Sequence, residues 1–119
     1  MLYTKPYPLN LTLSDKELVQ IIHRVADVYN VRPHLVMGRR RYIPLAEARQ
    51  MAMVIAYKRI GNYMEVGRLF NRHHGNVIHA RKHILDLLTY DKKVIARWHN
   101  LCDLAVRRTP PEPPSDYQI

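Results

Sequence analysis

The chain has 119 residues, a formal net charge of +9 at pH 7 and 47% hydrophobic residues. This length suits one domain with its own core, and no run of roughly 18 apolar residues, as a membrane-spanning helix requires, occurs in the sequence. A lone cysteine, Cys102, excludes an internal disulfide and a cysteine-based zinc site. The N-terminal residues MLYTKPYPLN contain no apolar segment followed by a small-residue cleavage site, so we expect a cytoplasmic protein without a secretory leader.

The positive charge is concentrated in the middle of the chain. Between Val28 and Leu85 there are eleven arginines and lysines but only two acids, Glu47 and Glu65, so this segment carries +9 and the remainder is neutral. Such a concentration is typical of a protein that binds a polyanion, most often nucleic acid. General solubility charge is the alternative, but it does not account for the neutral flanks.

The residue pattern divides the chain into three parts. We expect an extended arm over residues 1–13, an all-α domain over residues 14–108, and a disordered tail over residues 109–119. The tail contains four prolines in eleven residues, which is typical of disorder. The sequence predicts no strand and contains no internal repeat.

The first two predicted helices precede a basic loop. Ser14 and Glu17 form a capping box, and the apolar spacing behind it predicts a helix to about Tyr29. Pro33 suits the first position of a second, short helix, which Gly38 ends. Three consecutive arginines follow this glycine in the sequence GRRR.

The third predicted helix is the most apolar one. Pro44 can begin it, and Gly61 ends it. Its composition is almost wholly apolar after Gln50, which indicates a central, buried helix. We expect Arg49 and Gln50 near its exposed start.

Two further helices read as a helix-turn-helix. They extend over about 63–70 and 75–89, joined by the polar turn FNRHHGN, and Asp91 can cap a sixth helix behind them. In this motif the start of the second helix enters the major groove of DNA. Gly75 lies at that start, where a missing side chain allows a close approach of the backbone to a base or phosphate.

Three segments together resemble one known family. They are the GRRR loop, the ARQMAM stretch in the third helix, and FNRHHGNVIHA, which is similar to the family signature G-R-D-H-x-T-V-x-H-A. Over residues 18–104 the chain resembles the C-terminal DNA-binding domain (domain IV) of the bacterial chromosomal replication initiator DnaA. The resemblance implies an all-α, Trp-repressor-like fold of about six helices, binding of double-stranded DNA at a replication origin, and no catalysis.

The resemblance also implies which residues contact DNA. Arg41 would enter the minor groove, while Arg39 and Arg40 would lie on phosphates. Arg49 and Gln50 match positions that touch the DNA backbone. The signature segment would contribute further DNA contacts, and His74 would face base edges there. The residues of this sequence at the signature's contact positions are Arg72, His73, His74, Gly75 and Asn76. Lys82, further along the same helix, is a further expected contact.

Three residues depart from the family pattern. His73 stands where the family has aspartate, and Gly75 and Asn76 replace two threonines. A carboxylate that accepts from a base and a methyl that could touch thymine are both lost. We expect DNA binding with a changed sequence preference, in which Asn76 could read adenine.

The histidines of this segment also allow a metal site or a nuclease site. His79 and His83 are four residues apart, a spacing that can chelate zinc with His73 or His74 as a third ligand, but no cysteine lies nearby. A nuclease built on HHGN would need carboxylates, and the nearest ones fall on other helices or faces. We therefore expect no metal, no cofactor and no enzymatic activity.

The expected partners follow from these features. No G-x-x-x-x-G-K-[ST] motif occurs, so we expect that the chain binds no nucleotide and lacks the family's ATPase. We expect a stand-alone DNA-binding module that is associated with the nucleoid. Alternatives are a transcriptional regulator of the same fold and a module that binds a replication initiator protein. We expect a monomer or weak dimer of bacterial or phage origin.

Overall fold

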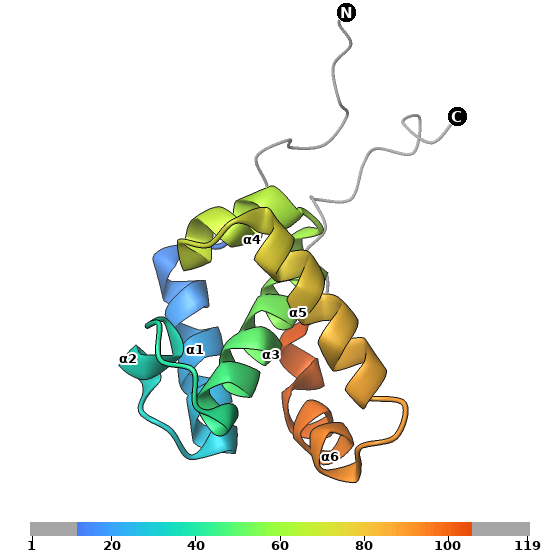
Figure 1. Cartoon of the computed structure of the whole chain (residues 1–119). Coiled ribbons are helices and arrows are strands. Elements are labelled where there is room, and N and C mark those ends of the chain that lie inside the picture. The colour runs from blue at the N-terminus through green and yellow to red at the C-terminus, as the bar shows by residue number, and fades with distance from the viewer. Residues whose placement is uncertain (1–11, 106–119) are drawn as a thin grey trace, which may run out of the picture.

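The computed structural model describes residues 12–105 and is all-α, as predicted (Figure 1). The described residues contain six α-helices and a short 3-10 helix, and no strand occurs among them. The elements are α1 (Asp15–Tyr29), α2 (Pro33–Val36), α3 (Ile43–Ile60), α4 (Tyr63–Phe70), α5 (His74–Leu87), α6 (Lys92–Leu101) and η1 (Cys102–Ala105). The predicted tail, and the predicted arm as far as residue 11, lie outside the described residues.

α3 runs through the centre of the fold, and α1, α2, α4, α5 and η1 pack around it (Figure 1). Apolar residues of α3 itself are distributed around most of its circumference, so the helix can be buried along most of its length. Its buried residues are Leu45, Ala48, Arg49, Met51, Ala52, Met53, Val54, Ile55, Ala56 and Ile60. The prediction of a central, buried third helix is confirmed.

α1 begins and ends where the sequence predicts. The backbone N–H of Glu17 donates to the Ser14 hydroxyl at 3.2 Å, and the Ser14 N–H donates to the Glu17 carboxylate at 2.8 Å, which completes the capping box. Asn30 ends the helix in the left-handed conformation with φ 55°. Leu13, at the end of the predicted arm, is buried in the core.

α4 and α5 form the predicted helix-turn-helix, and the turn between them is tight. Asn71 ends α4 with φ 55°, and the Arg72 N–H donates to the Gly67 carbonyl at 2.7 Å. A Cβ at Gly67 would lie 2.6 Å from the Arg72 carbonyl oxygen, so only glycine allows this approach. The position of α5 relative to α4 therefore depends on one glycine.

α6 closes the domain, with one difference from the sequence prediction. The Asp91 carboxylate caps it, accepting from the N–H groups of Lys93 and Val94 at 2.9 and 3.2 Å. Helical spacing behind this cap predicts a core position for Cys102, but the residue is exposed. The helix changes into η1 at this residue, which alters the register, and the core contact passes to Leu104.

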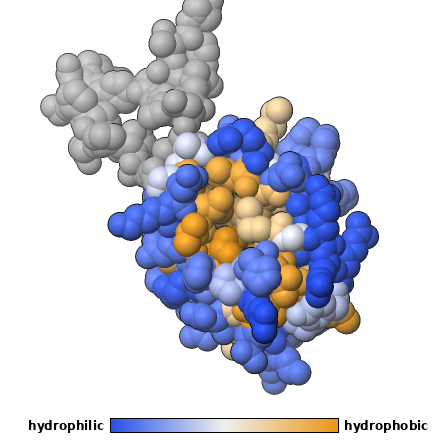
Figure 2. All heavy atoms as spheres, turned by 90° about the vertical axis from the view of Figure 1, so that its left-hand side faces the viewer, coloured by the Kyte–Doolittle hydropathy of each residue, from blue (hydrophilic) through white to orange (hydrophobic). Residues whose placement is uncertain are grey.

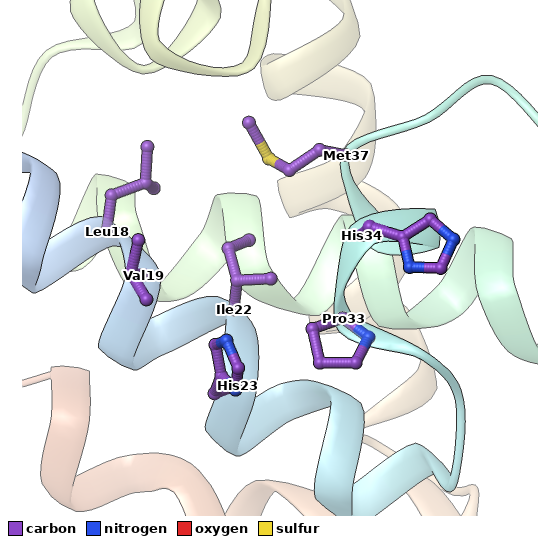
Figure 3. A pocket seen from close by; sticks show the side chains of 7 residues that line it. All are labelled: Leu18, Val19, Ile22, His23, Pro33, His34 and Met37. Atoms are coloured by element: carbon purple, nitrogen blue, oxygen red, sulfur yellow. The ribbon is translucent and has the colours of Figure 1, made fainter.

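An apolar face lies on the outer side of α1 and α2. Figure 2 shows hydrophobic side chains gathered there, surrounded by hydrophilic ones. They form an open groove of about 490 Å³, lined by Leu18, Val19, Ile22, His23, Pro33, His34 and Met37 (Figure 3). None of the described helices is both long and apolar enough to cross a bilayer.

Candidate nucleic-acid interface

The arginine loop and the start of α5 meet on one surface. A shallow hollow of about 360 Å³ lies between them. Two regions far apart in the sequence line it. The first is the loop with the adjoining start of α3, which contributes Arg41, Ala46, Arg49 and Gln50; the second is the turn with α5, which contributes Arg72, Asn76, His79 and Ala80. The fold therefore brings the arginine loop, the first half of α3 and the first turns of α5 together on one surface.

The loop itself presents three cations to solvent. Arg39, Arg40 and Arg41 are all exposed. None of them forms an ion pair with a carboxylate among residues 12–105. Three adjacent unpaired guanidinium groups repel one another, so an anion placed against them would be attracted strongly.

The two acids of the basic segment are engaged elsewhere. Glu47 accepts from the Tyr29 hydroxyl and from Arg97 Nη1 at 3.1 Å. Burial and the nearby Glu47 carboxylate raise the pKa of Tyr29, so this phenol remains a donor. Glu65 accepts from Arg68 at 2.6 and 2.9 Å. Neither carboxylate neutralises the arginine loop.

Arg49 lies where the sequence did not predict it. We expected it near an exposed helix start, but the residue is buried, with 7% of its surface exposed. Its Nε donates to the Val36 carbonyl at 2.7 Å, Nη1 to Arg40 at 2.9 Å and Nη2 to Leu35 at 3.1 Å. At the end of the short helix α2, Arg49 therefore satisfies the Val36 carbonyl and adds a second donor to the Leu35 carbonyl, which also accepts from the Gly38 N–H at 3.1 Å. Its neighbour Gln50 remains partly exposed.

Arg72 is tied to the backbone on two sides. Its Nη2 donates to the Gly38 carbonyl, and its Nη1 donates to the carbonyls of Phe70 and Asn71 at 3.1 and 3.4 Å. Burial, with the neighbouring arginines, lowers the pKa of both Arg49 and Arg72. The arginines of this surface therefore lie close enough to repel one another, which a phosphate would relieve.

The start of α5 is capped by an imidazole. His73 Nδ1 accepts from the Gly75 N–H at 3.0 Å, so His73 serves as the N-cap in place of the family's aspartate. Its ring lies 4.2 Å from that of His74, centroid to centroid. A Cβ at Gly75 would be 3.1 Å from His73 Nδ1, so a side chain at this position would require a small shift of the capping ring. Asn76 is exposed beside them.

The structure adds one residue to the predicted surface and separates another from it. His79 is exposed and lines the hollow. Its spacing of three from Asn76 places both on one face of α5, a signal present in the sequence. Lys82 is exposed but lies outside the hollow. Across residues 12–105, no three His, Cys, Asp or Glu side chains group so as to hold a metal ion.

Comparison with known proteins agrees with this architecture. Residues 18–84 match the family described as the bacterial DnaA protein helix-turn-helix. Over 114 residues the chain is 26% identical to the chromosomal replication initiator protein DnaA of Tropheryma whipplei strain Twist, covering 84% of this chain and 24% of that protein. The DnaA protein of strain TW08/27 gives the same values. The chain spans about a quarter of the length of these curated relatives. Because the family matches more than half of the chain, the chain belongs to the bacterial DnaA helix-turn-helix family.

Proposed function

We propose that this protein binds double-stranded DNA with a sequence preference of its own, in replication initiation or its regulation. The observation that carries the proposal is the shared surface of the arginine loop and the start of α5. This surface concentrates cations that no carboxylate pairs with among residues 12–105. Membership of the DnaA helix-turn-helix family supports DNA binding. The proposal concerns DNA binding alone and does not include the other activities of the whole initiator.

Two elements would contact the duplex in different ways. The first turn of α5 would enter the major groove, and the arginine loop would follow the adjacent backbone with Arg41 in the minor groove. Phosphate contacts position a protein on DNA, whereas base contacts specify the sequence. We assign positioning to Arg39, Arg40, Gln50 and Lys82, and base contact to His74, Asn76 and, in addition, His79.

The sequence preference should differ from that of the family. His73 caps α5 through Nδ1, which leaves Nε2 as its donor and no carboxylate to accept from a base. Asn76 is exposed and can pair with an adenine edge through two hydrogen bonds. The methyl groups of the family's threonines are absent at Gly75 and Asn76. Recognition would therefore shift away from the standard initiator box.

Selection of bound sequences from a random duplex pool at near-physiological salt tests the proposal. The initiator box serves as the control sequence, and Asn76→Ala serves as the variant that should lose a preference without losing all binding. An enriched motif that differs from the box is the expected result. Binding without any enriched motif would limit the function to non-specific DNA binding. If no duplex is bound, the proposed function is wrong.

The alternative function, a module that binds a replication protein, places a different demand on the surface. Apolar contact is insensitive to salt, whereas binding through six phosphates weakens about a thousandfold over a fourfold rise in salt. The apolar groove of α1 and α2 would serve this alternative, and Val19, 53% exposed, lies within it. Val19→Asp should leave DNA affinity nearly unchanged if the arginine surface is the binding site. A larger loss of DNA affinity in Val19→Asp than in Arg41→Ala would show that the arginine surface is not the DNA-binding site.

A further inference from the structure

The arginine loop is held by side chains instead of by its own backbone. Outside the helices, no backbone–backbone hydrogen bond within residues 12–105 involves residues 39–41. The carbonyls of Val36, Gly38 and Arg40, which flank and form the loop, accept from two guanidinium groups. The Leu35 carbonyl accepts from Arg49 as well as from the Gly38 N–H at 3.1 Å. The conformation of the loop therefore depends on the two arginines that donate to it.

These two arginines come from different parts of the fold. Arg49 belongs to the central helix α3, and three of its N–H groups are used on backbone carbonyls. Arg72 lies in the turn that begins α5, where its own backbone N–H donates to Gly67 at 2.7 Å. Through Gly38, Arg72 connects the loop to the start of α5. Together the two side chains fix the loop against both helices.

Only arginine can make these contacts. A guanidinium offers five N–H donors in a rigid planar fork, whereas an ammonium offers three donors at a single point. With 7% of its surface exposed and three donors on carbonyls, Arg49 has little left to offer a phosphate. The mutual repulsion of Arg49, Arg72 and Arg41 is the electrostatic cost of holding the loop in this way.

We propose that Arg49 and Arg72 are positioning residues that clamp the arginine loop to the start of α5, so that the minor-groove and major-groove contacts act as one unit. This inference rests on the proposed function. It assigns Arg49 a role in presenting Arg41, in place of the phosphate contact that the family resemblance implies. Replacement of either arginine by lysine would keep the charge of the surface but would release the arginine loop from its fixed position.

Limited trypsin digestion of the whole chain tests the clamp without DNA. Trypsin cleaves after arginine in locally opened segments, and cleavage tracks the population of the open state. In Arg49→Lys and Arg72→Lys, cleavage after residues 39–41, mapped by mass spectrometry, should become about tenfold faster, because hydrogen bonds from charged donors are lost. Arg40→Lys is the matched control, because it also replaces a loop arginine by lysine but removes no clamp contact. Unchanged cleavage in both clamp variants would overturn the inference.

A double-mutant cycle on DNA binding tests the coupling. If Arg49 positions Arg41, the loss of affinity caused by Arg41→Ala should shrink several-fold in an Arg49→Lys background. If Arg49 is instead a phosphate contact, Arg49→Lys keeps most affinity and the two effects are additive. Should Arg49→Lys fail to fold, as circular dichroism would show, the half-buried Arg72→Lys supplies the same cycle.

Failure of the inference and failure of the proposed function have different signatures. If the wild-type protein binds no duplex, the proposed function is wrong, and the coupling between Arg49 and Arg41 in DNA binding cannot exist. The digestion still decides whether Arg49 and Arg72 hold the loop. If the protein binds DNA, the effects of the mutations are additive and the digestion is unchanged, then the proposed function stands and the clamp inference is wrong.

Discussion

Replacement of Gly67 by alanine should destabilise the helix-turn-helix. The new Cβ would lie 2.6 Å from the Arg72 carbonyl oxygen, 3.2 Å from the His74 nitrogen and 3.3 Å from its Cα. All three atoms belong to the backbone, so no side chain can rotate away, and α4 must separate from the turn. The expected effect is therefore a loss of stability together with a displaced start of α5.

The magnitude follows from two opposing contributions. Overpacking against backbone belongs at the upper end of its usual range, about 3 kcal/mol. Alanine in a helix interior is better than glycine by about 1 kcal/mol. The net loss in the free energy of unfolding is about 2 kcal/mol, which corresponds to a fall in Tm of roughly 10 °C for a domain of this size.

Thermal unfolding followed by circular dichroism measures this change. Gly38→Ala is the matched control, because a Cβ there would meet its nearest atom, the Leu35 carbonyl oxygen, at an ordinary 3.4 Å. Its stability should stay within about 0.5 kcal/mol of the wild type. A Gly67→Ala protein that melts within two or so degrees of the wild type would refute the argument, because the close approach would then not be a constraint.

Three further predictions concern the interface and its surroundings. Arg41→Ala should weaken binding to every DNA sequence and lower the salt slope by about 0.9 for each lost phosphate-type contact, measured by titration at several salt concentrations. Asn76→Ala should instead reduce discrimination between the preferred and an altered site by about 1–3 kcal/mol; identical behaviour of the two variants would contradict the division between positioning and reading. The Arg68 guanidinium, as the main donor, lowers the pKa of Glu65. The stability from this pair is therefore complete above about pH 4.3 and is lost as pH falls through the lowered pKa. Glu65→Gln should accordingly flatten the acid end of a urea-unfolding series, and an unchanged acid limb would show that the pair contributes nothing.

Much of the fold was readable from local patterns. The Ser14 capping box, the Asp91 cap and the uniformly apolar third helix each depend on residues within a few positions of one another, and the structure confirms all three. The family match over residues 18–84 likewise follows the motifs that the sequence presents in order. Helical periodicity and capping act over one or two turns, which is why a sequence alone contains them.

The arrangement of the arginines depended on tertiary structure. The sequence placed Arg49 and Arg72 among the residues that contact DNA, but it could not show that their donors meet the carbonyls of α2 and of the loop. Those carbonyls come from residues 9 to 34 positions away, and the contacts exist only once α2 and the α4–α5 turn have packed against α3. By itself the sequence determined which segments are helical and where the positive charge lies. Which charges face solvent and which hold the backbone was decided by packing, because a buried polar group must find its partners wherever the chain brings them.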